Sequence, residues 1–170
     1  MIYKIEGIPM NINKVIEVLK NTQPTQYASE DRFAYYDKVN DEFIFFFLQD
    51  EYELEVNEHY PNKLELLLSR SNRIKRLNEC LKDEDKRFIY IKNPVSNNQL
   101  IRAYIDSYHK DKNIYPKLTR SFSGYKRKER FKKALLELNL KEDYEKFVAD
   151  SLKNIAIKWC LRNNIEYEKN

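Results

Sequence analysis

The sequence predicts an α+β fold, with a small, aromatic-rich, mainly antiparallel sheet and a carboxyl-terminal layer of amphipathic helices. Segments rich in aromatic and β-branched residues lie within residues 1–95, whereas apolar residues spaced three and four apart dominate residues 96–165. No proline-rich linker, repeat or low-complexity tract divides the 170 residues. We therefore expect a single globular domain over residues 1–170, sheet-rich over 1–95 and helical over 96–165.

The first expected elements are a short strand and a helix. Apolar and polar residues alternate over residues 1–6, as in a strand with one buried face. Asn11 then precedes an apolar stripe with helical spacing, consisting of Ile12, Val15, Ile16 and Leu19. Because asparagine is a favoured residue at helix starts, we expect a helix that begins just after Asn11.

Residues 32–38 and 42–49 form the clearest hairpin candidate, because both segments are rich in aromatic residues and Asn40-Asp41 can occupy a turn between them. The second segment contains the unbroken apolar run 43–48. A strand that is apolar on both faces is typical of a position covered from both sides rather than a half-wet edge. We therefore expect helices or loops over each face of this strand.

The middle of the chain contains one ambiguous segment and two clear ones. Residues 52–69 fit either a strand or a helix, and both alternatives stay open. A helix is indicated by the stripe Ile74, Leu77, Cys80 and Leu81. Residues 87–92 have the composition of a strand, which we expect Pro94 to end.

Three features predict the carboxyl-terminal helices. Ser96 and Gln99 have the spacing of a capping box ahead of an apolar stripe that runs to Tyr108. After a basic stretch with no predicted structure, a second helix is indicated by Phe131, Ala134, Leu135 and Leu138. A box-like start at Asn139 opens a third helix that ends near Asn163. Its expected core residues are Phe147, Val148, Leu152, Ile155 and Trp159.

The composition excludes several classes of enzyme site. Only two glycines are present, Gly7 and Gly124, whereas phosphate-binding loops, dinucleotide fingerprints and nucleophile elbows each need several close together. Cys80 and Cys160 lack disulfide or zinc spacing, and His59 and His109 lack metal-ligand spacing. We therefore predict no catalytic residues, no metal and no cofactor. Enzyme activity stays open, with a non-enzymatic protein favoured.

The carboxylates of residues 50–58 alternate with apolar residues and could line one face of a strand. Paired acids can hold a divalent metal or divide acid and base roles. The same alternation is the ordinary polar side of a half-buried strand, which we favour.

The amino terminus lacks a basic segment followed by an apolar one, and the longest apolar run, 43–48, is far shorter than a membrane span. The two isolated cysteines suit a reducing compartment. We expect a cytoplasmic protein with no membrane contact.

Charge is distributed unevenly within a net charge of +4. Residues 1–60 carry 5 Lys and Arg against 12 Asp and Glu, and residues 61–170 carry 26 against 15. Residues 41–58 hold seven acids and no cation, whereas residues 110–133 hold ten cations and two acids. Whether the acidic 41–58 segment neutralises the basic 110–133 segment, or each meets a partner, stays open.

The candidate binding residues are the cations at the start of the second carboxyl-terminal helix. They are Lys126, Arg127, Lys128, Arg130, Lys132 and Lys133. If Ser123 caps this helix, Lys126, Arg130 and Lys133 share one side. Cations in a first turn oppose the helix macrodipole, and a bound phosphate would relieve that mismatch. Five nearby aromatic residues could stack on unpaired bases: Tyr104, Tyr108, Tyr115, Phe122 and Tyr125. The simpler interpretation is a solvated helix face.

Several residues of the carboxyl-terminal half match a family pattern in register. They are Gly124, Arg130, Phe131, Lys132 and Trp159. On these residues the half resembles the bacterial uncharacterised protein family 0158. Tyr144 stands where that family usually has tryptophan, and residues 125–128 lose a glycine and a phenylalanine and gain cations. The family has no assigned activity, so the resemblance implies a bacterial cytosolic protein and identifies no catalytic residues.

Two functions fit these observations. The first is a non-enzymatic cytosolic binding protein that contacts nucleic acid or another polyanion through the basic helix. The alternative is a protein-interaction or regulatory module whose acidic and basic poles engage a protein partner or a second copy in a homodimer. A hydrolase would need the carboxylates of residues 50–58 to bind a metal.

Overall fold

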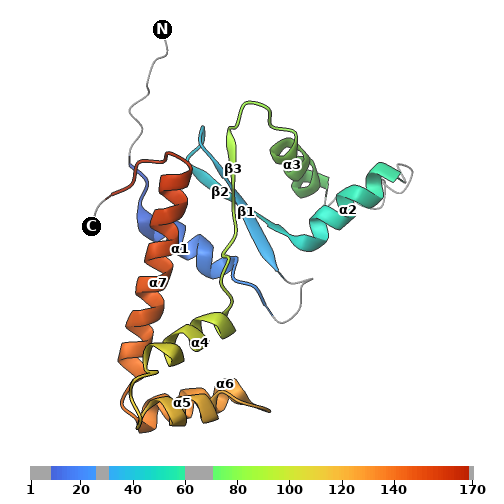
Figure 1. Ribbon diagram of the computed structural model, residues 1–170. Coiled ribbons are helices and arrows are strands. Elements are labelled where there is room, and N and C mark those ends of the chain that lie inside the picture. The colour runs from blue at the N-terminus through green and yellow to red at the C-terminus, as the bar shows by residue number, and fades with distance from the viewer. Residues whose placement is uncertain (1–8, 26–30, 60–70, 169–170) are drawn as a thin grey trace. The chain divides into compact units, whose positions relative to one another are not determined.

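The computed structural model describes residues 9–25, 31–59 and 71–168 (Figure 1). The chain divides into two compact units. The sheet unit consists of Met1–Pro94 with Ala156–Asn170, and the helical unit is Val95–Ile155. The division after Pro94 lies where sheet-rich sequence was expected to give way to helices. The single domain expected over residues 1–170 stays a prediction, because compact units of this size can be two parts of one domain or two separate domains.

The sheet has three strands in the order β2-β1-β3, and both pairings are antiparallel. The strands are β1 (Arg32–Asp37), β2 (Glu42–Phe47) and β3 (Phe88–Ile91). β1 and β2 form the predicted hairpin, with Arg32 opposite Phe47 and Asp37 opposite Glu42. The turn between them spans residues 38–41 and includes the left-handed Asp41. The predicted α+β fold with a small antiparallel sheet is confirmed.

The position expected for β2 is wrong. β2 is an edge strand with Phe45 38% exposed, whereas the central strand is β1, where Phe33 and Ala34 are fully buried. β3 takes the other side of β1 through a long-range pairing that the local apolar run does not encode. β2 also ends at Phe47 rather than residue 49.

The end of β2 has a local cause. The Asp50 carboxylate accepts a hydrogen bond from the Phe47 amide at 2.8 Å, as an acidic residue does in the first turn of a helix. The helix α2 (Leu48–His59) therefore begins directly after the strand.

Helices pack on both faces of the sheet, as expected. On one face, Phe33 and Phe46 form a buried cluster with Leu77 and Cys80 of α3 (Ser71–Leu81). On the other, Trp159 at the end of α7 (Lys141–Arg162) makes ring contacts with Tyr36 and Phe43 at 6.1 Å between centroids. Its indole N–H also donates to the Tyr90 carbonyl at 3.0 Å.

The helix α1 (Ile12–Asn21) begins as predicted, with the Asn11 side chain accepting from the Asn13 amide at 2.9 Å. Its end is tied to the segment after β3. The Thr22 hydroxyl accepts from the Asn93 amide at 3.0 Å, and the Asn93 side chain donates to the Leu19 carbonyl at 3.1 Å. Because Thr22 and Asn93 are both buried, these hydrogen bonds satisfy polar groups that water does not reach.

The ambiguous segment 52–69 is helical as far as it is described, because α2 continues to His59. The strand face suggested for the carboxylates of residues 50–58 is therefore wrong: residues two apart on a helix point in different directions. The strand expected over residues 1–6 and the remainder of 52–69 lie outside the described residues.

The expected core of the last helix is divided between the two units. Trp159 belongs to the sheet unit, whereas Phe147 packs against the core of the helical unit. Twelve residues of α-helix span about 18 Å, so two side chains at this separation cannot share one cluster.

A fully buried carboxylate, Asp37, ties the hairpin to α3 and to the start of β3. The Arg87 guanidinium donates two hydrogen bonds to its oxygens, at 2.7 and 2.6 Å, and Arg76 of α3 donates a third at 3.1 Å. The backbone amides of Val39 and Asn40 also donate to it. The hydrogen bonds from Arg87 lower the pKa of Asp37 to about 2.

We expect Asp37→Asn to lower the free energy of unfolding by about 1–3 kcal/mol at pH 7, because charge-assisted hydrogen bonds to two arginines are lost. The folded-state pKa lies below the ordinary value of 3.8. The contribution of Asp37 to the free energy of unfolding is therefore present above about pH 4 and is lost as the pH falls towards 2.

Urea unfolding between pH 7 and pH 2.5 measures this effect. The matched control is Asp85→Asn, which removes an exposed carboxylate and should leave stability within about 0.5 kcal/mol. A difference between wild type and Asp37→Asn that stays constant down to pH 2.5 would contradict the assignment.

Candidate functional site

The helical unit is built from α4 (Asn97–Ser107), α5 (Tyr115–Ser121), α6 (Arg127–Glu137) and the first part of α7. α4 begins with the predicted capping box. The Ser96 hydroxyl accepts from the Gln99 amide at 3.3 Å, and the Gln99 side chain accepts from the Ser96 amide at 2.8 Å.

The basic stretch after α4 was expected to lack regular structure, which is wrong because it contains α5. Pro116 lies in the first turn of α5, where a missing amide N–H costs little. Ahead of it, the Asp111 carboxylate accepts from the backbone amides of Asn113 and Ile114 at 2.8 and 2.9 Å and forms a turn. Leu118 is fully buried and fixes the helix against its neighbours.

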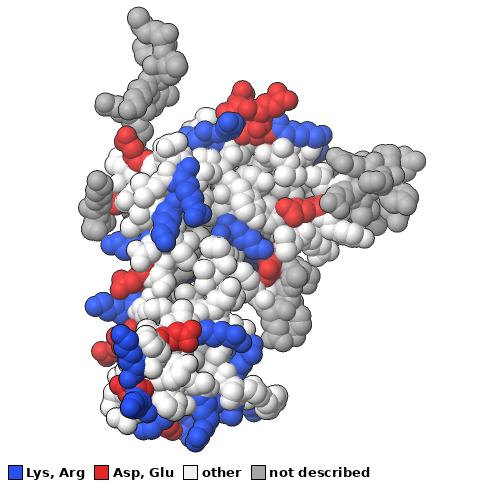
Figure 2. All heavy atoms as spheres, viewed as in Figure 1, with Lys and Arg blue, Asp and Glu red and all other residues white. Residues whose placement is uncertain are grey.

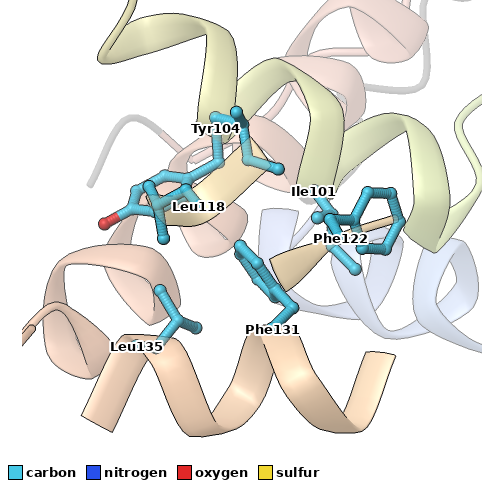
Figure 3. Packing of buried hydrophobic residues seen from close by; sticks show 7 residues of the cluster. Ile101, Tyr104, Leu118, Phe122, Phe131 and Leu135 are labelled. Carbon is cyan, nitrogen blue, oxygen red and sulfur yellow. The ribbon is translucent and has the colours of Figure 1, made fainter. Parts of the chain in front are cut away.

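A buried aromatic ring, that of Phe131, holds α6 against α5. Figure 3 shows Phe131 and Leu135 projecting from α6 towards Leu118 and Phe122. The Phe131 ring is 1% exposed and lies edge-on to the Phe122 ring, at 5.8 Å between centroids. It makes a similar contact with Tyr144 at 5.2 Å. These contacts fix the orientation of α6 and therefore the directions in which its cations point.

α6 begins at Arg127, and the expected cap at Ser123 is wrong. The Ser123 hydroxyl instead donates to the Arg120 carbonyl at 2.8 Å, at the end of α5. Gly124 and Lys126 both have left-handed backbone conformations, with φ of +66° and +52°. They reverse the chain direction between the two helices.

The cations at the start of α6 are less crowded than expected. Lys126 precedes the helix, and its ammonium lies 5.6 Å from the centre of the Tyr125 ring. The Arg127 guanidinium lies 5.3 Å from the centre of the Phe122 ring. Glu129 supplies a carboxylate in the first turn, as the macrodipole favours.

A groove with a volume of about 590 Å³ lies between α5 and α6. Four exposed cations line it: Lys117, Arg120, Arg130 and Lys133. Its apolar lining comes from Pro116, Ala134 and Leu138, and Glu137 is its one carboxylate. In Figure 2, Lys and Arg side chains gather along the lower edge of the view, over α5 and α6.

The structure therefore divides the six predicted cations. Arg130 and Lys133 face the groove, together with Lys117 and Arg120 of α5. Lys128 and Lys132 lie on another side of α6, which we call the flank, since a shift of two residues turns a helix by about 200°. Sequence reasoning missed Lys117 and Arg120 because the helical nature of α5 was missed. Their spacing of three residues after Pro116 was the available signal.

Local acids neutralise little of this charge. Within the described part of the helical unit, Lys133 pairs with Glu137 at 3.7 Å, and the other five predicted cations make no ion pair. In the sheet unit, acids of the 41–58 segment have cations of their own: Asp41 pairs with Lys14, Glu42 with Arg76, and Asp50 with Arg73.

A second polar cluster joins α4 to the start of α7. The Asp143 carboxylate accepts hydrogen bonds from the Tyr104 and Tyr108 hydroxyls at 2.9 and 2.7 Å. These hydrogen bonds lower the pKa of Asp143, and the one from Tyr108 has the largest effect. Burial raises the pKa of both phenols, so they stay protonated at neutral pH. The cluster is therefore suited to holding helices together rather than to proton transfer.

Four of the five aromatic residues suggested for base stacking are engaged within the fold. Tyr104 and Phe122 are buried, Tyr108 binds Asp143, and Tyr115 packs against the same core. Tyr125 is 85% exposed. The stacking interpretation is therefore retained for Tyr125 alone.

The two cysteine thiols are buried and are poorly suited to nucleophilic catalysis. Burial raises the pKa of the Cys80 thiol to about 11 and also raises that of Cys160, so both stay protonated at neutral pH. Among the described residues, no three His, Cys, Asp or Glu side chains form a group that could hold a metal ion. None of the described helices, including the 22-residue α7, has the apolar length needed to cross a membrane.

No model of a protein family matches the chain, and no significant match was found among curated proteins or solved structures. The resemblance of the carboxyl-terminal half to family 0158 stays a prediction.

We expect Phe131→Ala to destabilise the helical unit by about 3–5 kcal/mol, because it leaves a cavity where α5, α6 and α7 meet. The matched control on the same helix is Leu136→Ala, whose side chain is 61% exposed and should contribute little. Chemical unfolding followed by circular dichroism measures both variants. Equal effects of the two substitutions would contradict the packing described for α6.

Proposed function

We propose that the chain is a non-enzymatic protein that binds nucleic acid or another polyanion through the cations of α5 and α6. The observation that supports this most directly is the groove itself, which has four cations against one carboxylate. A protein surface that neutralises phosphates in this way releases condensed counterions, which is the main source of affinity for nucleic acids.

The distribution of acids adds support. Within the sheet unit, Asp41, Glu42 and Asp50 already have cationic partners. The acidic segment therefore carries less unneutralised negative charge than the charge count of the two halves suggested. Cations with few local acids remain free to meet a ligand of opposite charge.

The chemistry of the described side chains also favours binding. The thiols of Cys80 and Cys160 and the phenols of Tyr104 and Tyr108 stay protonated at neutral pH, so these four groups are poor nucleophiles there. We further propose a cytosolic location, in which two buried free cysteines stay reduced. The alternative, a module that engages a protein partner or a second copy through its two charge poles, has less support because the acidic pole is partly paired within its own unit.

Binding should weaken steeply with salt. Four contacts to a single strand give a log–log slope near −3, so the affinity should fall roughly 50-fold between 50 and 200 mM salt. Fluorescence anisotropy with a labelled 20-nucleotide oligomer measures this dependence. A flat salt response would contradict the proposal.

Charge reversal tests which surface is responsible. Arg130→Glu with Lys133→Glu should abolish most of the binding. The control, Lys20→Glu with Lys38→Glu, reverses two exposed cations of the sheet unit and changes the net charge equally. Equal losses in the two double variants would show that overall charge, rather than α6, drives the binding.

A further inference from the structure

The groove between α5 and α6 combines two kinds of surface that a single ligand would have to match. Its rim carries cations from both helices, and between them lie the apolar groups of Pro116, Ala134 and Leu138. Inorganic anions and acidic peptides of Asp and Glu use the first surface but not the second. A ligand with regularly spaced phosphates and exposed flat apolar rings uses both.

A groove between two packed helices is too narrow to admit a duplex to its interior. The axes of two packed helices lie about 8–10 Å apart. A nucleic-acid duplex is wider than this, since its major groove alone measures about 12 Å. In a duplex the base faces are also hidden by stacking, so the apolar lining would have nothing to contact. A single strand is narrow enough to enter and presents its bases.

The loop that joins the two helices supplies an aromatic surface. Tyr125 lies in this loop and is 85% exposed, so its ring contributes little to the stability of the fold. The Lys126 ammonium lies 5.6 Å from the ring centre, which places a cation next to a flat apolar face. This pairing of a stacking surface with a phosphate contact is the arrangement used to bind unpaired nucleotides.

We propose that the α5–α6 groove binds single-stranded nucleic acid, with phosphates on its four cations and bases on its apolar lining and on Tyr125. This proposal rests on the proposed function and narrows it to one ligand class and one face of α6. The flank cations, Lys128 and Lys132, then contribute only long-range attraction.

Two double variants with equal charge change test the face of α6. The groove variant, Lys117→Gln with Arg120→Gln, should weaken binding of a labelled oligo(dT) 20-mer at least tenfold and reduce the salt slope by about 1.4. The flank variant, Lys128→Gln with Lys132→Gln, should weaken it less than threefold. All four side chains are exposed, so neither variant should unfold the protein, and circular dichroism checks this. Equal losses in the two variants would overturn the groove assignment.

Substitutions of Tyr125 separate the contribution of base stacking to binding from that of charge. Tyr125→Ala should weaken binding of the same 20-mer roughly tenfold without changing the salt slope, because it removes a stacked base but no phosphate contact. Tyr125→Phe keeps the ring and should bind like wild type. An unchanged affinity in Tyr125→Ala would overturn the role of this residue.

The choice of ligand class is tested with the wild-type chain. A 20-base-pair duplex and poly-glutamate should each compete at least tenfold less well than unlabelled oligo(dT). Competition by either ligand at equal strength would overturn the single-strand proposal while leaving the binding of polyanions intact. If neither the oligomer nor the duplex nor poly-glutamate binds, the proposed function fails and this inference fails with it.

Discussion

The candidate site depends on the burial of the Phe131 ring between α5, α4 and the start of α7. This ring contacts Phe122, Tyr104 and Tyr144, so one apolar side chain fixes the neighbours of α6. A helix anchored along one side has its remaining sides set by the 3.6-residue period. The direction in which Arg130 and Lys133 point is therefore a consequence of the packing of Phe131.

The two units differ in how their charged side chains are paired. In the sheet unit, Asp37 and Asp50 are buried, and Asp37 is paired with two arginines and Asp50 with one, which satisfies the carboxylates but orders long side chains. In the helical unit, the cations of α5 and α6 stay in water, with Lys133–Glu137 as a weak exposed pair. Strong pairing favours a structural role in the first unit. Weak pairing in the second leaves the positive charge available to a ligand.

Local signals predicted most of the helices and the hairpin, because each of them is encoded by neighbouring residues. Asn11 and Ser96 begin their helices through short-range hydrogen bonds, and the apolar stripe of α6 buries Phe131 and Leu135 as its spacing indicates. Two of the failures were also local in origin. The stretch that contains α5 was expected to lack regular structure although Pro116 suits a first turn, and Asp50 was placed on a strand face although it lies in the first turn of α2.

By itself the sequence determined the α+β class, the hairpin and the concentration of cations in residues 110–133, since composition and periodicity carry that information. Only the tertiary structure decided that β1 is central, because strand order follows from the pairing of β3 with a segment more than 50 residues earlier. It likewise decided which cations share a groove. Lys117 and Arg130 are 13 residues apart and come together because Leu118 and Phe131 are buried in one cluster.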